Sequence, residues 1–89
     1  MTETEIAKHI SEKLDSEIKG CSSYLDMTQM AMKQDDSELA VALSEMAKDE
    51  YTHAHFIFTY MAEMGMEVPE ETRHAFYALK KRIEAFPRG

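Results

Sequence analysis

The stretch DEYTHAHF at residues 49–56 places two ionisable side chains, Glu50 and His53, three positions apart in a segment rich in helix-forming residues. Both belong to a stripe whose members alternate in steps of four and three, which is the spacing of one face of an α-helix. The stripe consists of Leu39, Leu43, Met46, Glu50, His53, Ile57, Tyr60 and Met64. It predicts a helix over residues 38–64 with a polar pair in the middle of an apolar face.

Similar patterns on both sides of this segment predict two further helices and no strand. The first runs over about residues 4–33, and its stripe consists of Leu14, Ile18, Cys21, Leu25, Thr28 and Met32. It is separated from the second by Gln-Asp-Asp-Ser at residues 34–37, where Asp and Ser suit a helix N-cap. Gly65 suits the end of the second helix, and Pro69 suits the first position of a third. The stripe of the third helix consists of Thr72, Phe76, Leu79, Ile83 and Phe86.

The lengths of these segments predict how the helices are arranged. A turn as short as residues 34–37 joins antiparallel neighbours, so the first two helices form a hairpin. Two long helices cannot enclose a core between them, and the shorter third helix covers only part of one side. We therefore expect an all-α chain, with a hairpin domain over residues 1–65 and a C-terminal helix over residues 66–89. Two such hairpins are expected to pair as a homodimer into a four-helix bundle.

Composition excludes several classes of function. The 89 residues carry a net charge of −7, which argues against binding to nucleic acid. The sequence has no apolar run long enough to span a membrane and no signal-peptide core, so we expect a cytoplasmic protein. Its one cysteine, Cys21, excludes an internal disulfide and a Cys-x-x-Cys metal site. We expect Cys21 to act as a small buried apolar residue.

A second carboxylate, Glu17, is expected to lie beside the polar pair of the second helix. If the hairpin turns near Asp35, Glu17 and His53 are equally far from the turn, and Glu50 is one helical turn nearer to it. The three side chains can then converge, and carboxylates buried in a bundle need a neutralising partner. Two hairpins would supply four carboxylates and two imidazoles, which is the ligand set of di-metal carboxylate bundles. Oxygen and imidazole donors suit iron, manganese or zinc.

The chain also resembles a known family. Glu17 followed by Tyr24 (Glu-x₆-Tyr), together with the stretch at residues 49–56, is similar to the first half of a rubrerythrin over about residues 10–65. The resemblance implies the ferritin-like superfamily, with Glu17, Glu50 and His53 as iron ligands and Tyr24 behind them. In having half of the usual four helices, the chain is similar to the encapsulated ferritins, whose short chains build the iron site between two subunits.

These observations lead to one main functional hypothesis and two alternatives. The main hypothesis is a homodimer, or a larger homo-oligomer, with a di-iron site shared by two chains that oxidises Fe²⁺ with O₂ or peroxide. Such a protein would handle iron or defend against peroxide. One alternative is a metal-free helical module that dimerises and binds another protein. The other is a zinc- or manganese-binding bundle without redox chemistry.

The eight methionines suggest a second interface. Three of them, Met32, Met46 and Met64, fall on the predicted core stripes. The remaining internal methionines lie off these stripes and are candidates for another contact surface: Met27, Met30, Met61 and Met66.

Overall fold

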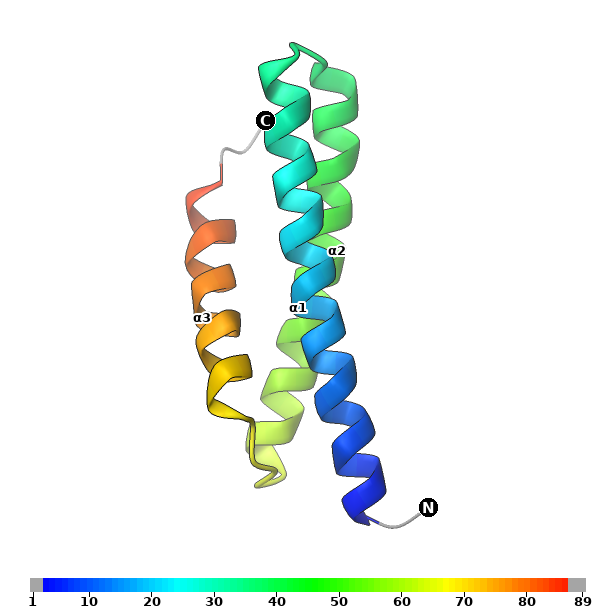
Figure 1. Ribbon diagram of the computed structural model, residues 1–89, viewed down its shortest axis with the longest axis vertical. Helices are drawn as coiled ribbons and strands as arrows, with labels where there is room; N and C mark the ends of the chain where they lie inside the picture. Colours follow the sequence, from blue (N-terminus) through cyan, green and yellow to red (C-terminus); the bar gives the residue numbers. More distant parts are fainter. Residues whose placement is uncertain (1–2, 87–89) are drawn as a thin grey trace.

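Three helices make up the fold in the computed structural model, which describes residues 3–86. Helix α1 spans Glu3–Lys33, α2 spans Ser37–Glu63 and α3 spans Glu70–Ala85, and residues 3–86 contain no strand. Helices α1 and α2 form an antiparallel hairpin, and α3 lies along one side of it (Figure 1). The predicted all-α chain of three helices is confirmed. Among the described residues, no helix is both long and apolar enough to cross a membrane.

The turn between α1 and α2 is tight because Asp36 takes part in both the end of α1 and the start of α2. The backbone N–H of Asp36 donates to the carbonyl of Ala31 at 2.9 Å, and that of Asp35 donates to the carbonyl of Met32 at 3.1 Å. This pair of hydrogen bonds is a Schellman motif, and it puts Asp35 in the left-handed region with φ 56°. The side chain of Asp36 then accepts a hydrogen bond from the N–H of Leu39 at 3.1 Å and caps α2. The predicted cap at this break is confirmed.

The end of α2 repeats the same motif with a glycine. Gly65 has φ 69°, and the N–H of Met66 donates to the carbonyl of Met61 at 2.8 Å. Glycine takes this conformation without steric cost, as predicted for this position. The prediction for Pro69 was wrong by one position. Pro69 is the N-cap of α3 with an extended ψ of 141°, and the helix starts at Glu70.

A column of mostly small side chains brings α2 close to α1. Its members recur every seven residues, and all are buried: Ala40, Ala47, Ala54 and Met61. The approach is close enough for the Cys21 thiol of α1 to donate a hydrogen bond to the backbone carbonyl of Ala47 at 3.1 Å. The core also contains the α1 residues Leu14, Ile18 and Leu25. We refer to the four α2 positions as the inner column.

The expected division of the methionines was wrong in this part of the hairpin. Met61, expected outside the core, is 1% exposed, whereas Met46 and Met64 are 47% and 60% exposed. Met32, on the predicted stripe of α1, is 46% exposed. On α2, the inner column explains why Met46 is exposed. The small residue that follows it, Ala47, permits closer packing against α1 than Met46 would. Large residues of the predicted stripe consequently lie at the edge of the contact.

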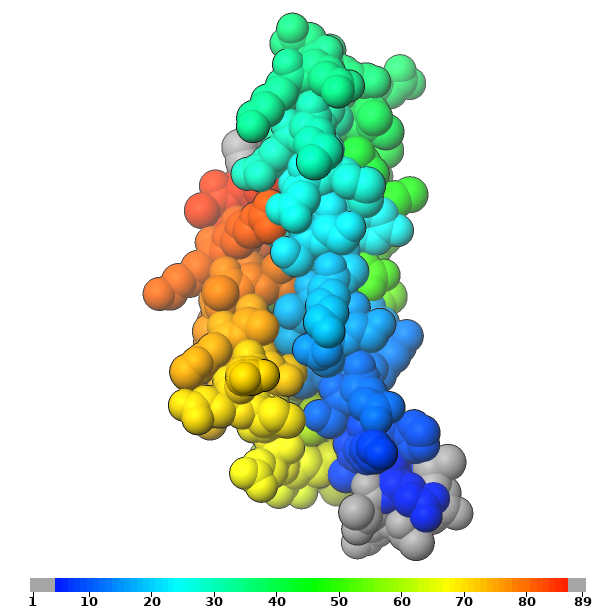
Figure 2. Space-filling view, viewed as in Figure 1, coloured from blue at the N-terminus to red at the C-terminus, as the bar shows by residue number. Residues whose placement is uncertain are grey.

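Helix α3 covers one side of the hairpin. The ring of Phe76 stacks on that of Phe58 in α2, with centroids 4.3 Å apart. Arg82 donates to the Asp26 carboxylate of α1 at 2.6 Å. Because α3 is shorter than the other two helices, the turn end of the hairpin extends beyond it (Figure 2). The opposite side of the hairpin, between α1 and α2, has no cover within residues 3–86.

Candidate metal centre

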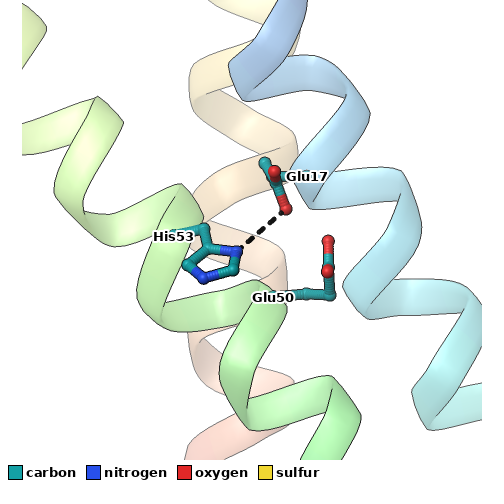
Figure 3. Close-up of side chains that lie close together, drawn as sticks. All are labelled: Glu17, Glu50 and His53. Carbon is teal, nitrogen blue, oxygen red and sulfur yellow. Dashed lines mark ion pairs between the residues drawn. The ribbon is translucent and has the colours of Figure 1, made fainter.

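Three side chains from the two long helices meet on the side of the hairpin that α3 does not cover. Glu17 comes from α1, and Glu50 and His53 come from successive turns of α2 (Figure 3). Each offers one ligand atom, and these atoms all lie within 4.8 Å of one another. Three donors within this distance could hold a metal ion. Among the described residues, no other group of three His, Cys, Asp or Glu side chains has this geometry.

The tight turn brings these residues together. Because it uses so few residues, positions equally far from it on the two helices lie at the same height. Glu17 and His53 fulfil this condition, and His53 Nδ1 lies 3.5 Å from Glu17 Oε2. Glu50 and His53 share one face of α2 because they are three residues apart. The convergence predicted from the sequence is confirmed.

The Glu17 carboxylate is buried without full compensation. The residue is 7% exposed, and its Oε2 atom has no hydrogen-bond partner among the described residues. An unsatisfied, buried carboxylate oxygen is costly, so it marks a position for a cation or a proton donor. The His53 side chain is 58% exposed, so the group opens outward between α1 and α2.

The two carboxyl groups have opposite pKa shifts. Hydrogen bonding with Glu17 raises the pKa of Glu50, and burial and the negative charge of Glu17 raise it further. The same hydrogen bond lowers the pKa of Glu17, and Lys13 lowers it further, although burial opposes both effects. Of the two carboxyl groups, Glu50 is therefore the one that holds a proton more readily. A proton on Glu50 reduces the repulsion between two carboxyl groups that lie close together.

A fourth charged group, which was not predicted from the sequence, lies at this position. The ammonium Nζ of Lys13 lies 3.2 Å from Glu17 Oε1 and forms an ion pair with it. The Lys13 side chain is 64% exposed, so the ammonium remains in contact with solvent. The signal was present in the sequence, because Lys13 and Glu17 are four residues apart and face each other on a helix. Lys13 neutralises part of the charge that a metal ion would neutralise.

Other candidate residues lie elsewhere. Tyr24 is partly buried and packs against the core, and its predicted place behind the ligands stays a prediction. Cys21 is fully buried, as expected, and burial together with the nearby Glu50 charge raises the pKa of its thiol to about 11. A thiol with this pKa remains protonated at neutral pH and is a poor metal ligand. His55 lies near the rings of Tyr51 and Phe76 on the α3 side, so it does not join His53.

Comparison with known proteins agrees with this geometry. The rubrerythrin family model matches residues 8–86, which is nearly the whole chain and includes all three converging side chains. The chain belongs to the rubrerythrin family. No curated protein and no solved structure matches it. Membership of this family indicates a di-iron carboxylate protein, and Glu17, Glu50 and His53 are the described residues that could bind the metal.

Proposed function

We propose that the chain forms a homodimer in which two copies of the Glu17–Glu50–His53 group enclose a di-iron site that oxidises Fe²⁺ with O₂ or peroxide. One observation carries the proposal. The buried carboxylate of Glu17 has an oxygen without a hydrogen-bond partner, beside a second carboxylate and an imidazole. This donor set suits divalent iron, manganese or zinc. Membership of the rubrerythrin family favours iron.

The composition of one chain's group supports a site shared by two chains. Two carboxylates and one imidazole leave an ion with incomplete coordination, whereas a second copy doubles the donors to the set found in di-metal bundles. The side of the hairpin that carries the group is also the side that α3 leaves bare. A second hairpin on this side would complete both the bundle and the ligand set.

Exposed apolar residues of α2 support the same arrangement. They form a column that lies one residue earlier in the sequence than the inner column, and it includes a ligand: Leu39, Met46, His53 and Tyr60. We refer to these four positions as the outer column. Its apolar members are 45%, 47% and 40% exposed, respectively. Large apolar side chains aligned on one face are typical of a surface that packs against a partner.

The residues of the chain have distinct roles in this proposal. Glu17 and Glu50 supply anionic oxygen donors, and His53 supplies a neutral nitrogen donor. Metal binding competes with protonation of Glu50 and with the Lys13 ion pair of Glu17, since each of these neutralises charge that the ion would neutralise. When bound, an iron pair supplies the redox chemistry with O₂ or peroxide.

The proposal is tested by metal content and molecular size measured on the same samples. The metal-free chain is titrated anaerobically with Fe²⁺, and bound iron is counted alongside the mass in solution. We expect about one iron per chain and a dimer or a multiple of it. The Glu17→Gln variant should keep its helix content and lose iron binding. The matched control is Glu12→Gln on the same helix, because Glu12 is 61% exposed and pairs only loosely with His9, at 4.0 Å.

Three outcomes would contradict the proposal in different ways. A dimer that takes up no iron would favour the metal-free interaction module. A dimer that prefers zinc or manganese and does not oxidise Fe²⁺ would favour the non-redox metal site. Full iron binding by Glu17→Gln would show that the metal is held elsewhere.

A further inference from the structure

Gly20 occupies a position in α1 where glycine has no conformational purpose. It lies inside one continuous helix, three residues after Glu17, and its φ is not positive. In a helix interior glycine is less favourable than alanine, because it loses more backbone freedom on folding. The residue therefore lowers the stability of α1 without helping a turn or a cap.

The space beside Gly20 is taken by a side chain from the other helix. A Cβ atom placed on Gly20 would lie 3.0 Å from Glu50 Oε2 and 3.7 Å from the Glu50 carboxyl carbon. The first distance is shorter than an ordinary van der Waals contact between carbon and oxygen. The Glu50 carboxylate thus occupies the volume that a side chain at position 20 would need.

We propose that Gly20 is a positioning residue, whose missing side chain lets the Glu50 carboxylate lie against α1 within reach of Glu17 and His53. The inference rests on the proposed function, in which Glu50 is a metal ligand. A methyl group at position 20 would displace the carboxylate by a few tenths of an ångström (3.0 Å is too close, and ordinary contact is wider). A free glutamate accommodates such a shift easily, but a ligand does not, because metal–ligand distances tolerate only about 0.2 Å.

The Gly20→Ala variant is therefore expected to change two properties in opposite directions. Without metal, its thermal unfolding midpoint should rise, because alanine favours the helix. With Co²⁺ as the probe, titrated into the metal-free chain and followed by visible absorption, its affinity should fall by about 10-fold or more. The matched control is Ser23→Ala, an exposed position on the same helix, which should gain stability and bind Co²⁺ like the wild type.

A second measurement tests the contact without any metal. The stabilisation by Gly20→Ala is compared in the wild-type chain and in the Glu50→Ala variant, both in the presence of a chelator. If the methyl group meets the Glu50 carboxylate, the stabilisation is larger in the Glu50→Ala background. Equal stabilisation in the two backgrounds would overturn the contact on which the inference rests.

The possible results separate the two proposals. Wild-type protein that binds Co²⁺ no more tightly than Gly20→Ala would overturn the role of Gly20 and leave the metal site standing. Wild-type protein that binds neither Co²⁺ nor Fe²⁺ would overturn the metal site, and the role of Gly20 with it. If Ser23→Ala also lost affinity for Co²⁺, the cause would be greater helix stiffness in both variants. This result would also overturn the inference.

Discussion

The inner and outer columns of α2 lie one residue apart in the sequence but differ strongly in burial. Ala47 and Ala54 of the inner column are fully buried against α1, whereas Met46 of the outer column is 47% exposed. The inner column is made mostly of small residues and is satisfied within the chain. The outer column is made of large residues, includes His53 and lacks cover among the described residues. The comparison indicates that the inner column holds the hairpin together, and the outer column is the surface through which we propose that two chains meet.

The largest effect is expected from filling the inner column. Ala47→Leu would force a larger side chain into a contact so close that Cys21 bonds to the Ala47 carbonyl, and should destabilise the chain by about 2–3 kcal/mol. Urea unfolding monitored by circular dichroism measures the loss. Met46→Leu, one position away in the outer column, is the control and should cost much less. Similar losses in both variants would remove the distinction between the columns.

A charge in the outer column should separate the chains without unfolding them. Met46→Lys places a charge in the apolar surface that the proposed dimer would bury, and it should weaken the dimer by about 30-fold or more, because burying an unpaired charge is costly. Sedimentation measures the dissociation constant, and circular dichroism checks that the helices persist. An unchanged dimer would place the interface on another surface.

A smaller effect is expected from removing the cation that pairs with Glu17. Lys13→Met should tighten metal binding about 2- to 5-fold, because an exposed ion pair contributes little and the metal no longer competes with it. The control is Lys19→Met, since Lys19 pairs with Asp15 at 2.8 Å on the same helix. Weaker binding in Lys13→Met would mean that the ammonium helps to hold the site instead.

The smallest effect concerns the pH dependence of the metal-free chain. The pKa of Glu50 is raised by Glu17 and by burial, so its protonated form favours folding. That contribution is complete below the unfolded-state pKa and is lost as pH rises through the folded-state pKa. Glu17 has a lowered pKa, so its contribution is lost as pH falls through the folded-state value.

Glu50→Gln removes the loss of stability that accompanies ionisation of Glu50. The variant should therefore make the metal-free chain slightly more stable at neutral pH. Urea midpoints measured across the acidic-to-neutral range in a chelator test this, with Glu45→Gln as the exposed control. A parallel decline in wild type and Glu50→Gln would show that Glu50 is not the group responsible.

Much of the fold followed from helical spacing and from turn residues. The three helices, the Asp36 cap and the Gly65 ending were predictable because they depend on local chemistry. The choice between Met46 and Met61 for the core was not predictable from periodicity, since neighbouring columns of α2 are both apolar. Close approach of the helices decided between them, and that depends on where the small side chains are.

The candidate site was also predictable only in part. Glu17, Glu50 and His53 could be brought together by counting from the turn, because both helices rise equally per residue. The surroundings of these three residues could not be predicted by counting. The contact of Glu50 with Gly20 and that of Lys13 with Glu17 depend on side-chain conformations. The second chain remains a proposal, because no partner residue enters the geometry of one hairpin.

The shared use of Asp36 by two helices has a consequence for how this chain can vary. Any insertion or deletion between Glu17 and His53 would slide one helix past the other and rotate its faces, so the length of that segment is constrained even where individual residues are replaceable. The connection between α2 and α3 carries no such constraint from the site and can change length more freely. In related chains, length differences should therefore fall after residue 63 rather than at the apparently more exposed turn near residue 35.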